Sequence, residues 1–170
     1  MKKVLFFIII SSFMISCKCK KEAVKNAQKH QTTSINDCFE NSKCTQEIFK
    51  DSQLVIERDG IGKPFYKIET QKGTTVFRYL MKQNEDEQYV DGGYREEIIF
   101  ELPSDLKVGT YTDKQILETK ALFGVFCFCK DKAGYYPIKT GTITKTEKVI
   151  IVQFPTIVED QVVKSIQISL

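Results

Sequence analysis

The sequence predicts an all-β fold, an antiparallel β-sandwich or flattened barrel of about eight strands with one short helix near residues 112–122. After Asp37 the apolar residues follow a period of two, which is typical of strands, more than the helical period of 3.6. Short apolar runs alternate with turn signals such as "RDGIGKP" and "DGG". Residues 37–170 are long enough for one domain with its own core. A sheet with helices on one face is the second choice.

The first half of this domain contains four expected strands. "QLVIER" and "PFYKIET" are short candidates that the turn signal "RDGIGKP" separates. In "TTVFRYLMK" the larger apolar side chains alternate with other residues, and in "YREEIIFEL" Ile98, Phe100 and Leu102 share one face. The four expected strands span residues 53–58, 64–70, 74–82 and 94–102.

The second half begins with "ALFGVFCFC", residues 121–129, which is apolar on both faces and is expected in the centre of a sheet. "PIKTGTITK" and "KVIIVQF" are expected to form a hairpin around "KTEK". "QVVKSIQISL" closes the chain, with Ile166, Ile168 and Leu170 on one face.

The expected helix lies in "TYTDKQILETKALF". Thr112 stands three residues before Gln115, which is the pattern of a capping box. Ile116, Leu117 and Lys120 follow at helical spacing. We expect a short amphipathic helix that closes one end of the sheet structure.

The first residues predict export. Lys2 and Lys3 precede an apolar run, residues 4–15, that only two serines interrupt. A membrane-spanning helix needs about 20 apolar residues. The shorter run, with a basic head before it and small residues after it, is typical of a signal peptide.

The end of this run, "MISC", resembles the lipobox of bacterial lipoproteins. Ser16 supplies the small residue before the cysteine, and Met14 departs from the usual leucine. The resemblance implies that residues 1–16 are a lipoprotein signal peptide. It also implies that Cys17 carries a diacylglyceryl group and a further acyl chain such as palmitate, which together would give a stable membrane anchor.

The charge of the chain is unevenly distributed. The whole chain has 25 Lys and Arg residues against 22 Asp and Glu residues. Residues 1–30 contain seven lysines and one acidic residue, which leaves 18 basic and 21 acidic residues in the remainder. A mildly acidic domain without a basic stripe does not favour a nucleic-acid partner.

Residues 17–36 combine the lipidated cysteine with a polar segment that has too few apolar residues to form a core. We expect this segment to be a flexible tether. The only histidine, His30, falls within it, and a mobile tether would not hold a histidine in a preorganised metal or catalytic site.

Six cysteines are present, and exported proteins mature where cysteines usually pair. Cys17 is assigned to lipid, and Cys19 cannot replace it because Lys18 stands where the lipobox needs a small residue. Cys19 is therefore the odd thiol. The four disulfide candidates are Cys38, Cys44, Cys127 and Cys129.

The pairing of these four stays open among three arrangements. The favoured one joins Cys38 and Cys44 to Cys127 and Cys129, which would staple the start of the domain to a central, buried strand. A local bond between Cys38 and Cys44 is the alternative, with Cys127 and Cys129 either free or joined in a strained bond, because on a strand they lie about 6.6 Å apart. Four thiolates could also hold zinc or copper(I), although the spacing is uncommon for zinc.

The domain offers few catalytic candidates. No histidine follows His30, so a Ser-His-Asp or Cys-His constellation is not expected. "RDGIGK" lacks the spacing and the helix of a phosphate-binding loop. Glu96 and Glu97 would point to opposite faces of a strand, as solvated residues rather than an acid/base pair. We expect neither an enzyme nor a bound cofactor.

Tyrosines could line a binding face, although strand tyrosines are mostly ordinary sheet residues. The six candidates for such a face are Tyr79, Tyr89, Tyr94, Tyr111, Tyr135 and Tyr136.

The stretches "DCFENSKC", "GYREEIIFEL" and "ALFGVFCFCKDKAGYY" resemble small lipoproteins of Gram-negative envelopes, a resemblance that implies no activity. The basic "KCKKE" lacks the acidic pattern of surface display, which favours an outer-membrane anchor facing the periplasm. The sequence thus predicts a lipid-anchored, non-catalytic binding module for an unidentified envelope protein or ligand. The alternative is a thiol-based metal-binding or redox lipoprotein that uses Cys127 and Cys129.

Overall fold

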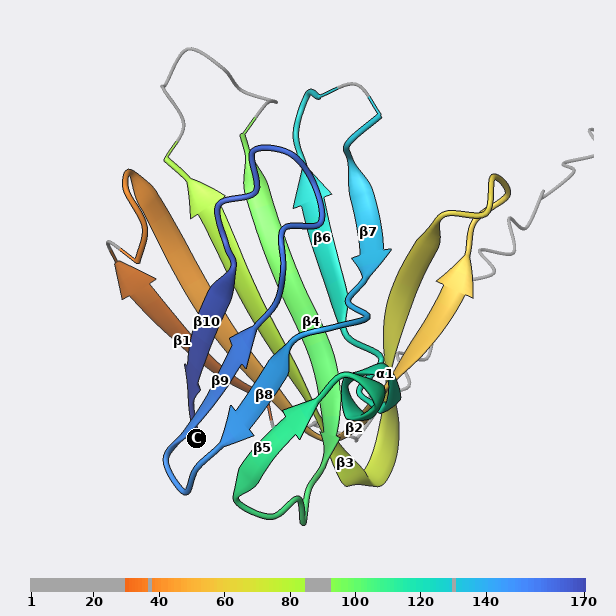
Figure 1. Ribbon diagram of the computed structural model, residues 1–170, viewed down its shortest axis with the longest axis vertical. Helices are drawn as coiled ribbons and strands as arrows, with labels where there is room; N and C mark the ends of the chain where they lie inside the picture. The colour runs from red at the N-terminus through yellow and green to blue at the C-terminus, as the bar shows by residue number, and fades with distance from the viewer. Residues whose placement is uncertain (1–29, 37, 85–92, 130) are drawn as a thin grey trace, which may run out of the picture.

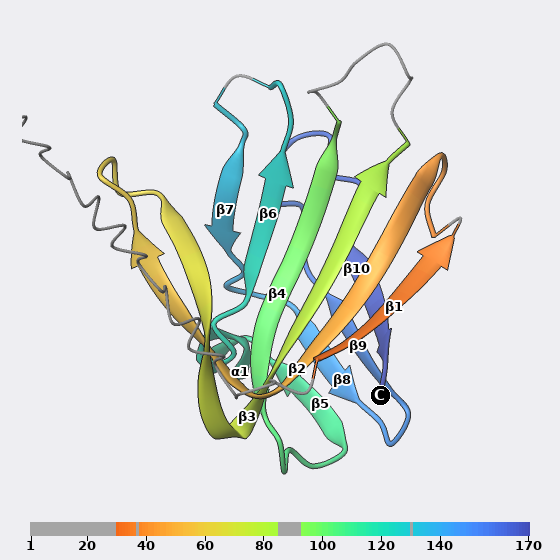
Figure 2. The same ribbon diagram turned by 180° about the vertical axis from the view of Figure 1, so that it is seen from behind.

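The computed structural model describes residues 30–36, 38–84, 93–129 and 131–170, and the predicted signal peptide, Cys17 and Cys19 lie outside these ranges. The described residues form two antiparallel sheets and one short helix, so the predicted all-β sandwich is confirmed and the closed-barrel alternative is not what the chain adopts. In these ranges the chain has ten strands rather than about eight. Figures 1 and 2 show the two sheets facing each other.

The larger sheet has the strand order β1-β2-β3-β4-β6-β7 and the smaller sheet the order β10-β9-β8-β5. The larger sheet consists of β1 (His30–Asn36), β2 (Ser42–Arg58), β3 (Pro64–Gln83), β4 (Arg95–Pro103), β6 (Leu122–Phe126) and β7 (Gly134–Pro137). The smaller sheet consists of β5 (Gly109–Thr112), β8 (Thr142–Lys145), β9 (Val149–Gln153) and β10 (Ser165–Ser169).

The main core lies between the two sheets, and the period-two patterns place their residues as predicted. Alternate residues of β3 and β4, including Phe77, Met81 and Phe100, point inward and meet the buried isoleucines of β8, β9 and β10. The hairpin expected around "KTEK" is present, since β8 and β9 pair directly. Ile166 and Ile168 are buried, whereas Leu170 lies after the end of β10 and is exposed.

β2 and β3 form one long hairpin, and its bend is the main feature that the sequence patterns miss. "QLVIER" and "PFYKIET" are the outer halves of these two strands rather than separate strands. At the bend, one residue of β2, Asp51, stands opposite residues 71–74 of β3. Asp51 and Gly73 adopt positive φ angles of 52° and 82°, a conformation that favours glycine and that asparagine and aspartate tolerate best among other residues.

The outer half of this hairpin, residues 52–70, is called the distal hairpin below. It packs on the outer face of the larger sheet, where Leu54 joins Val76, Ile99 and Leu122 in a second buried cluster. Figure 1 shows the distal hairpin in yellow beside β7.

The helix α1 (Lys114–Glu118) is shorter than the predicted 112–122. Gln115 Oε1 accepts a hydrogen bond from the backbone N–H of Thr112 at 3.2 Å, which is half of the expected capping box. Asp113 and Lys120 have positive φ angles, and these end the helical path on both sides. In the described part of the chain, no helix has the length and apolar character needed to cross a membrane.

β1 occupies the last part of the segment predicted to be a tether. Its seven residues, "HQTTSIN", pair with β2 from His30 opposite Phe49 to Asn36 opposite Lys43. An edge strand needs ladder hydrogen bonds but little burial, so counting apolar residues does not detect it. The tether expectation therefore fails for residues 30–36.

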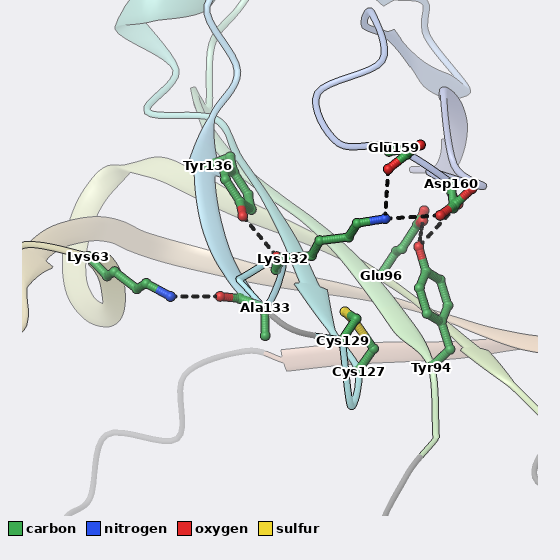
Figure 3. Close-up of a disulfide and its surroundings, with 10 residues drawn as sticks. All are labelled: Lys63, Tyr94, Glu96, Cys127, Cys129, Lys132, Ala133, Tyr136, Glu159 and Asp160. Carbon is green, nitrogen blue, oxygen red and sulfur yellow. Dashed lines mark hydrogen bonds and ion pairs between the residues drawn. A yellow bond between two sulfur atoms is a disulfide. The ribbon is translucent and has the colours of Figure 1, made fainter.

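Glu96 is fully buried on the core side of β4 and connects it to the segment before β10. Its carboxylate accepts hydrogen bonds from the backbone N–H groups of Val162 (2.7 Å) and Val163 (2.6 Å) and from the Tyr94 hydroxyl. Figure 3 shows Tyr94 pointing at this carboxylate. The Glu96 carboxylate thus has hydrogen-bond partners within the fold and connects two of its segments. It is not the solvated strand residue that the sequence predicts.

Replacing Glu96 by alanine should lower the free energy of unfolding by about 3 kcal/mol, because three hydrogen bonds to a buried charge are lost. Glu96→Gln, which keeps one acceptor oxygen, should lower the free energy of unfolding by less. Chemical denaturation measures both, with Glu118→Ala on the exposed face of α1 as the control, expected within about 0.5 kcal/mol of the wild type. An equal, small effect of Glu96→Ala and Glu118→Ala would contradict the assigned role.

Candidate functional site

The four disulfide candidates form two local bonds, Cys38–Cys44 and Cys127–Cys129, with Cα separations of 6.1 and 5.1 Å. The favoured staple between the two pairs is therefore wrong. The order of strands in the sheet prevents such a bond, because β3 and β4 lie between β2, which carries Cys44, and β6, which precedes Cys127. Three strand spacings of about 4.8 Å each exceed the Cα separation that a disulfide can bridge.

Cys127 and Cys129 do not lie on a buried strand, because β6 ends at Phe126. They follow it in the β6–β7 connection, where both are half-buried and Phe128 between them is 89% exposed. Figure 3 shows this bond at the tip of the hairpin. β6 also lies second from the sheet edge rather than at the centre, between β4 and β7.

A shared metal site of the four cysteines does not fit this arrangement, since the two pairs are on different parts of the larger sheet. Within residues 30–36, 38–84, 93–129 and 131–170, no group of three or more His, Cys, Asp or Glu side chains is placed to hold a metal ion. The lipid attachment at Cys17 and the role of Cys19 as the odd thiol remain predictions, because both residues lie outside the described ranges.

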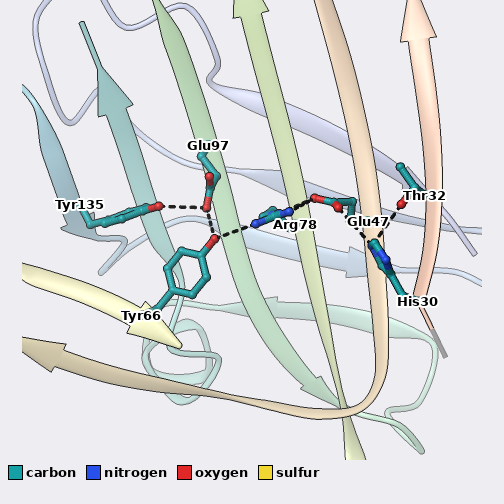
Figure 4. A network of polar contacts seen from close by, with 7 residues as sticks. All are labelled: His30, Thr32, Glu47, Tyr66, Arg78, Glu97 and Tyr135. Carbon is teal, nitrogen blue, oxygen red and sulfur yellow. Dashed lines mark hydrogen bonds and ion pairs between the residues drawn. The ribbon is translucent and has the colours of Figure 1, made fainter. Parts of the chain in front are cut away.

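A chain of polar side chains crosses the outer face of the larger sheet, and we call it the outer-face network (Figure 4). Arg78 on β3 stands at its middle and pairs through its guanidinium with Glu47 on β2. Its Nη1 also donates to the Tyr66 hydroxyl at 3.2 Å, and Tyr66 in turn donates to Glu97 on β4 at 2.6 Å. Tyr135 on β7 donates to the same Glu97 oxygen at 3.2 Å.

The network ends at His30, which the sequence places in a flexible tether and therefore outside any preorganised site. Its Nε2 lies 3.1 Å from Glu47 Oε1 and 3.1 Å from the Thr32 hydroxyl. Its ring stacks on Phe49, with the ring centres 4.4 Å apart. His30 is therefore held in place on β1, at the opposite end of the network from Tyr135.

Burial and the negative charge of Glu97 raise the pKa of Tyr66 to about 12. Burial, followed by the Glu97 charge, also raises the pKa of Tyr135. Burial disfavours the charged form of Arg78, but its hydrogen bonds to Tyr66 and Glu47 outweigh this, so its pKa is raised overall. Both phenols stay protonated at neutral pH and act as fixed hydrogen-bond donors to Glu97.

A groove with a volume of about 390 Å³ lies between the distal hairpin and β7. That volume is within the range of small-molecule sites. Tyr135 forms part of its wall and belongs to the outer-face network as well. At the rim, Lys63 Nζ donates to the backbone carbonyl of Ala133 at 3.2 Å, which links the two walls.

Gly124 on β6 lets the Tyr135 ring take this position. A Cβ atom at Gly124 would lie 2.6 Å from a ring carbon of Tyr135, closer than real contacts allow. The ring lies edge-on to Phe126 and Tyr66, with centres 5.1 and 5.3 Å away. The glycine within an otherwise apolar run is a sequence signal for this close approach.

The tyrosines proposed for a binding face divide between different roles. Tyr135 and Tyr136 line the groove, whereas Tyr79 is buried in the core and Tyr94 serves Glu96. Tyr111 donates to the backbone carbonyl of Lys107 beside β5, and Tyr89 lies outside the described residues.

The groove also uses residues that the sequence patterns did not single out. They are Arg58 and Lys63, the first and last residues of "RDGIGK", and Lys139 after β7. Tyr66, which shares the Glu97 carboxylate with the groove residue Tyr135, was not among the predicted tyrosines.

Comparison of the chain with protein-family models, with curated proteins and with solved structures finds no match.

The raised pKa of Tyr66 makes the stability of the fold fall at alkaline pH. Unfolded tyrosine ionises near pH 10, whereas folded Tyr66 holds its proton up to about pH 12. The folded state binds more protons in this window, so the stabilisation is complete below about pH 10 and is lost as the pH rises through 12.

Spectrophotometric titration of tyrosinate should show one fewer late-ionising tyrosine in Tyr66→Phe than in the wild type, in which the pKa of Tyr135 is raised as well. The unfolding free energy of the wild type should also decline more steeply than that of Tyr66→Phe between pH 10 and 12. Parallel curves for the two proteins would contradict the buried hydrogen bond to Glu97.

Proposed function

We propose that the chain is a lipid-anchored lipoprotein of a bacterial envelope, and that its folded domain is a non-catalytic binding module. The observation that carries the binding role is the groove between the distal hairpin and β7. The lipobox resemblance at Cys17 supports the anchor.

The walls of the groove are held in place without a ligand, which suits a binding site. At the base of the distal hairpin, Lys120 Nζ contacts both the carbonyl of Leu54 and the carboxylate of Glu101, each at 2.8 Å. Glu101 also accepts the backbone N–H of Leu54 at 2.5 Å. Together with the Tyr66–Glu97 bond and the Lys63–Ala133 bond, these contacts fix the hairpin against the sheet at both ends. A preformed site avoids the entropy cost of ordering a loop on binding.

The lipid on Cys17 would anchor the domain in the membrane, and the lysines that follow would lie at the bilayer surface. Basic residues after the lipidated cysteine favour the periplasmic side of the outer membrane over surface display. The ligand is then a component of the envelope, and nucleic acid is not an expected partner.

A thiol-based role is the second candidate, and one observation favours it. The Cys127–Cys129 bond sits at a hairpin tip beside the exposed Phe128, where another molecule could reach it. Accessible disulfides are the ones that exchange with external thiols.

Replacing Cys17 by alanine should abolish labelling of the protein by radioactive palmitate in bacterial cells and release it from the lipoprotein-processing pathway. Cys19→Ala is the matched control, since it removes the neighbouring thiol and should leave labelling unchanged. Labelling that survives Cys17→Ala, or that is lost in Cys19→Ala, would overturn the anchor assignment.

A photoreactive benzoylphenylalanine in place of Ile61 should crosslink an envelope component in cells. Ile61 lines the groove and is 80% exposed, so the substitution removes no core contact. The matched control carries the same group in place of Val108, which is 61% exposed and precedes β5 in the smaller sheet. Mass spectrometry of purified adducts identifies the captured molecule, whether protein, glycan or lipid.

The binding proposal expects a discrete adduct from position 61 that position 108 does not form, and that persists in the Cys127→Ser/Cys129→Ser background. Loss of the adduct in that background would favour the thiol-based role. Equal capture at both positions, or capture at neither, would refute the groove as the binding site.

A further inference from the structure

Three positive charges converge on the groove from three segments. Arg58 ends β2, Lys63 closes the turn before β3, and Lys139 follows β7. The residues that line the groove include no aspartate or glutamate. A hollow beside α1, by contrast, is lined by Glu101 and Glu118.

The charges of these three side chains are not neutralised by ion pairs in the described part of the chain. Arg58 Nη1 donates to the carbonyl of Gly62 at 2.7 Å, and Lys63 Nζ donates to that of Ala133 at 3.2 Å. Both cations thus use backbone carbonyls as partners and keep their full charge. The Lys139 side chain is exposed.

Two acidic residues adjoin Arg58 in the sequence, and both have other partners. Glu57 pairs with Lys67 at 2.7 Å, and the carboxylate of Asp59 is committed to the turn itself. Its Oδ1 accepts the backbone N–H groups of Ile61 at 3.0 Å and Lys63 at 2.8 Å. Because the remainder of the chain after residue 30 carries more acidic than basic residues, a concave site with three cations has a local field opposite to that of the domain.

We propose that this groove binds the phosphate group of an envelope ligand, an inference that rests on the proposed binding function. A phosphate monoester offers about two negative charges and three acceptor oxygens, so it can accept from a guanidinium and two ammonium groups together. A carboxylate has one charge and two oxygens and would leave part of the positive charge unmatched.

The remaining walls suit the organic part of such a ligand. Pro64, Pro137 and the Tyr135 ring provide apolar and aromatic surface next to the cations. A sugar or glycerol unit attached to phosphate would contact this surface while the phosphate faces the charges. The site differs from a glycine-rich phosphate loop, because side chains rather than backbone N–H groups of a helix supply the contacts.

The test is isothermal titration calorimetry of the full-length protein in a neutral detergent at low salt. The probes are inorganic phosphate, sn-glycerol 3-phosphate and dihexanoyl phosphatidic acid, whose headgroup is a phosphate monoester, with dihexanoyl phosphatidylcholine as the lipid control. Lys139→Gln is the principal variant, because the ammonium group of Lys139 makes no hydrogen bond or ion pair with the residues that the structure describes. Lys107→Gln, at an exposed lysine before β5, makes the same charge change away from the groove.

The wild type should bind sn-glycerol 3-phosphate, and Lys139→Gln should weaken binding about tenfold, the value of one charge-assisted hydrogen bond. Lys107→Gln should bind like the wild type. Added binding to phosphatidic acid, but not to phosphatidylcholine, would identify a lipid headgroup as the source of the phosphate. Binding of the soluble probes alone would identify a soluble phosphate ester.

No heat of binding with any phosphate probe would overturn the inference, and so would equal losses in Lys139→Gln and Lys107→Gln. Either result leaves the groove open to an uncharged ligand, which the crosslink at position 61 detects independently. Failure of the phosphate inference and failure of the binding function are therefore separable.

Discussion

The bend in the β2–β3 hairpin is the constraint on which the site depends. Asp51 and the residues around Gly73 turn the hairpin out of the plane of the larger sheet. Leu54 then reaches the outer cluster, and Tyr66 reaches Glu97. A straight hairpin of the same length would extend past the sheet edge, and the groove would have no second wall.

β4 holds the peripheral segments through three carboxylates, each serving a different part of the molecule. Glu96 faces the core and binds the backbone before β10. Glu97 and Glu101 face outward and bind the distal hairpin, Glu97 through Tyr66 and Glu101 through the N–H of Leu54. Buried carboxylates are costly unless they are fully hydrogen-bonded, so these contacts make the arrangement specific as well as stable.

Alternation of apolar residues was sufficient to predict the sheet core. The faces of β3 and β4 and the β8–β9 hairpin follow from period two alone, because alternate residues of each strand face the core between the sheets. β1 was missed for the opposite reason: six of its seven residues are polar, only Ile35 packs against the core, and the strand is held mainly by backbone pairing. The hairpin bend was missed because a bulge changes register without a change in composition.

The site was much less predictable than the core. Disulfide formation by the cysteines was predicted, but their pairing depends on the order of strands in the sheet. The sequence does not give that order, and β3 and β4, which lie between β2 and β6, exclude the staple. His30, Glu47 and Arg78 are far apart in sequence and meet only through the register of β1, β2 and β3. The charges of the groove come from a turn and a post-strand segment that no local pattern relates.

The start of β1 has a consequence for access to the groove. His30 pairs with Phe49, two residues before the bend, so the chain enters the fold at the end where the hairpin turns out of the sheet. Figures 1 and 2 show the tip of the distal hairpin at the opposite end. The groove residues in this turn, Arg58, Ile61 and Lys63, therefore lie away from the point where residue 30 enters the fold, so a ligand can reach them without passing the start of β1.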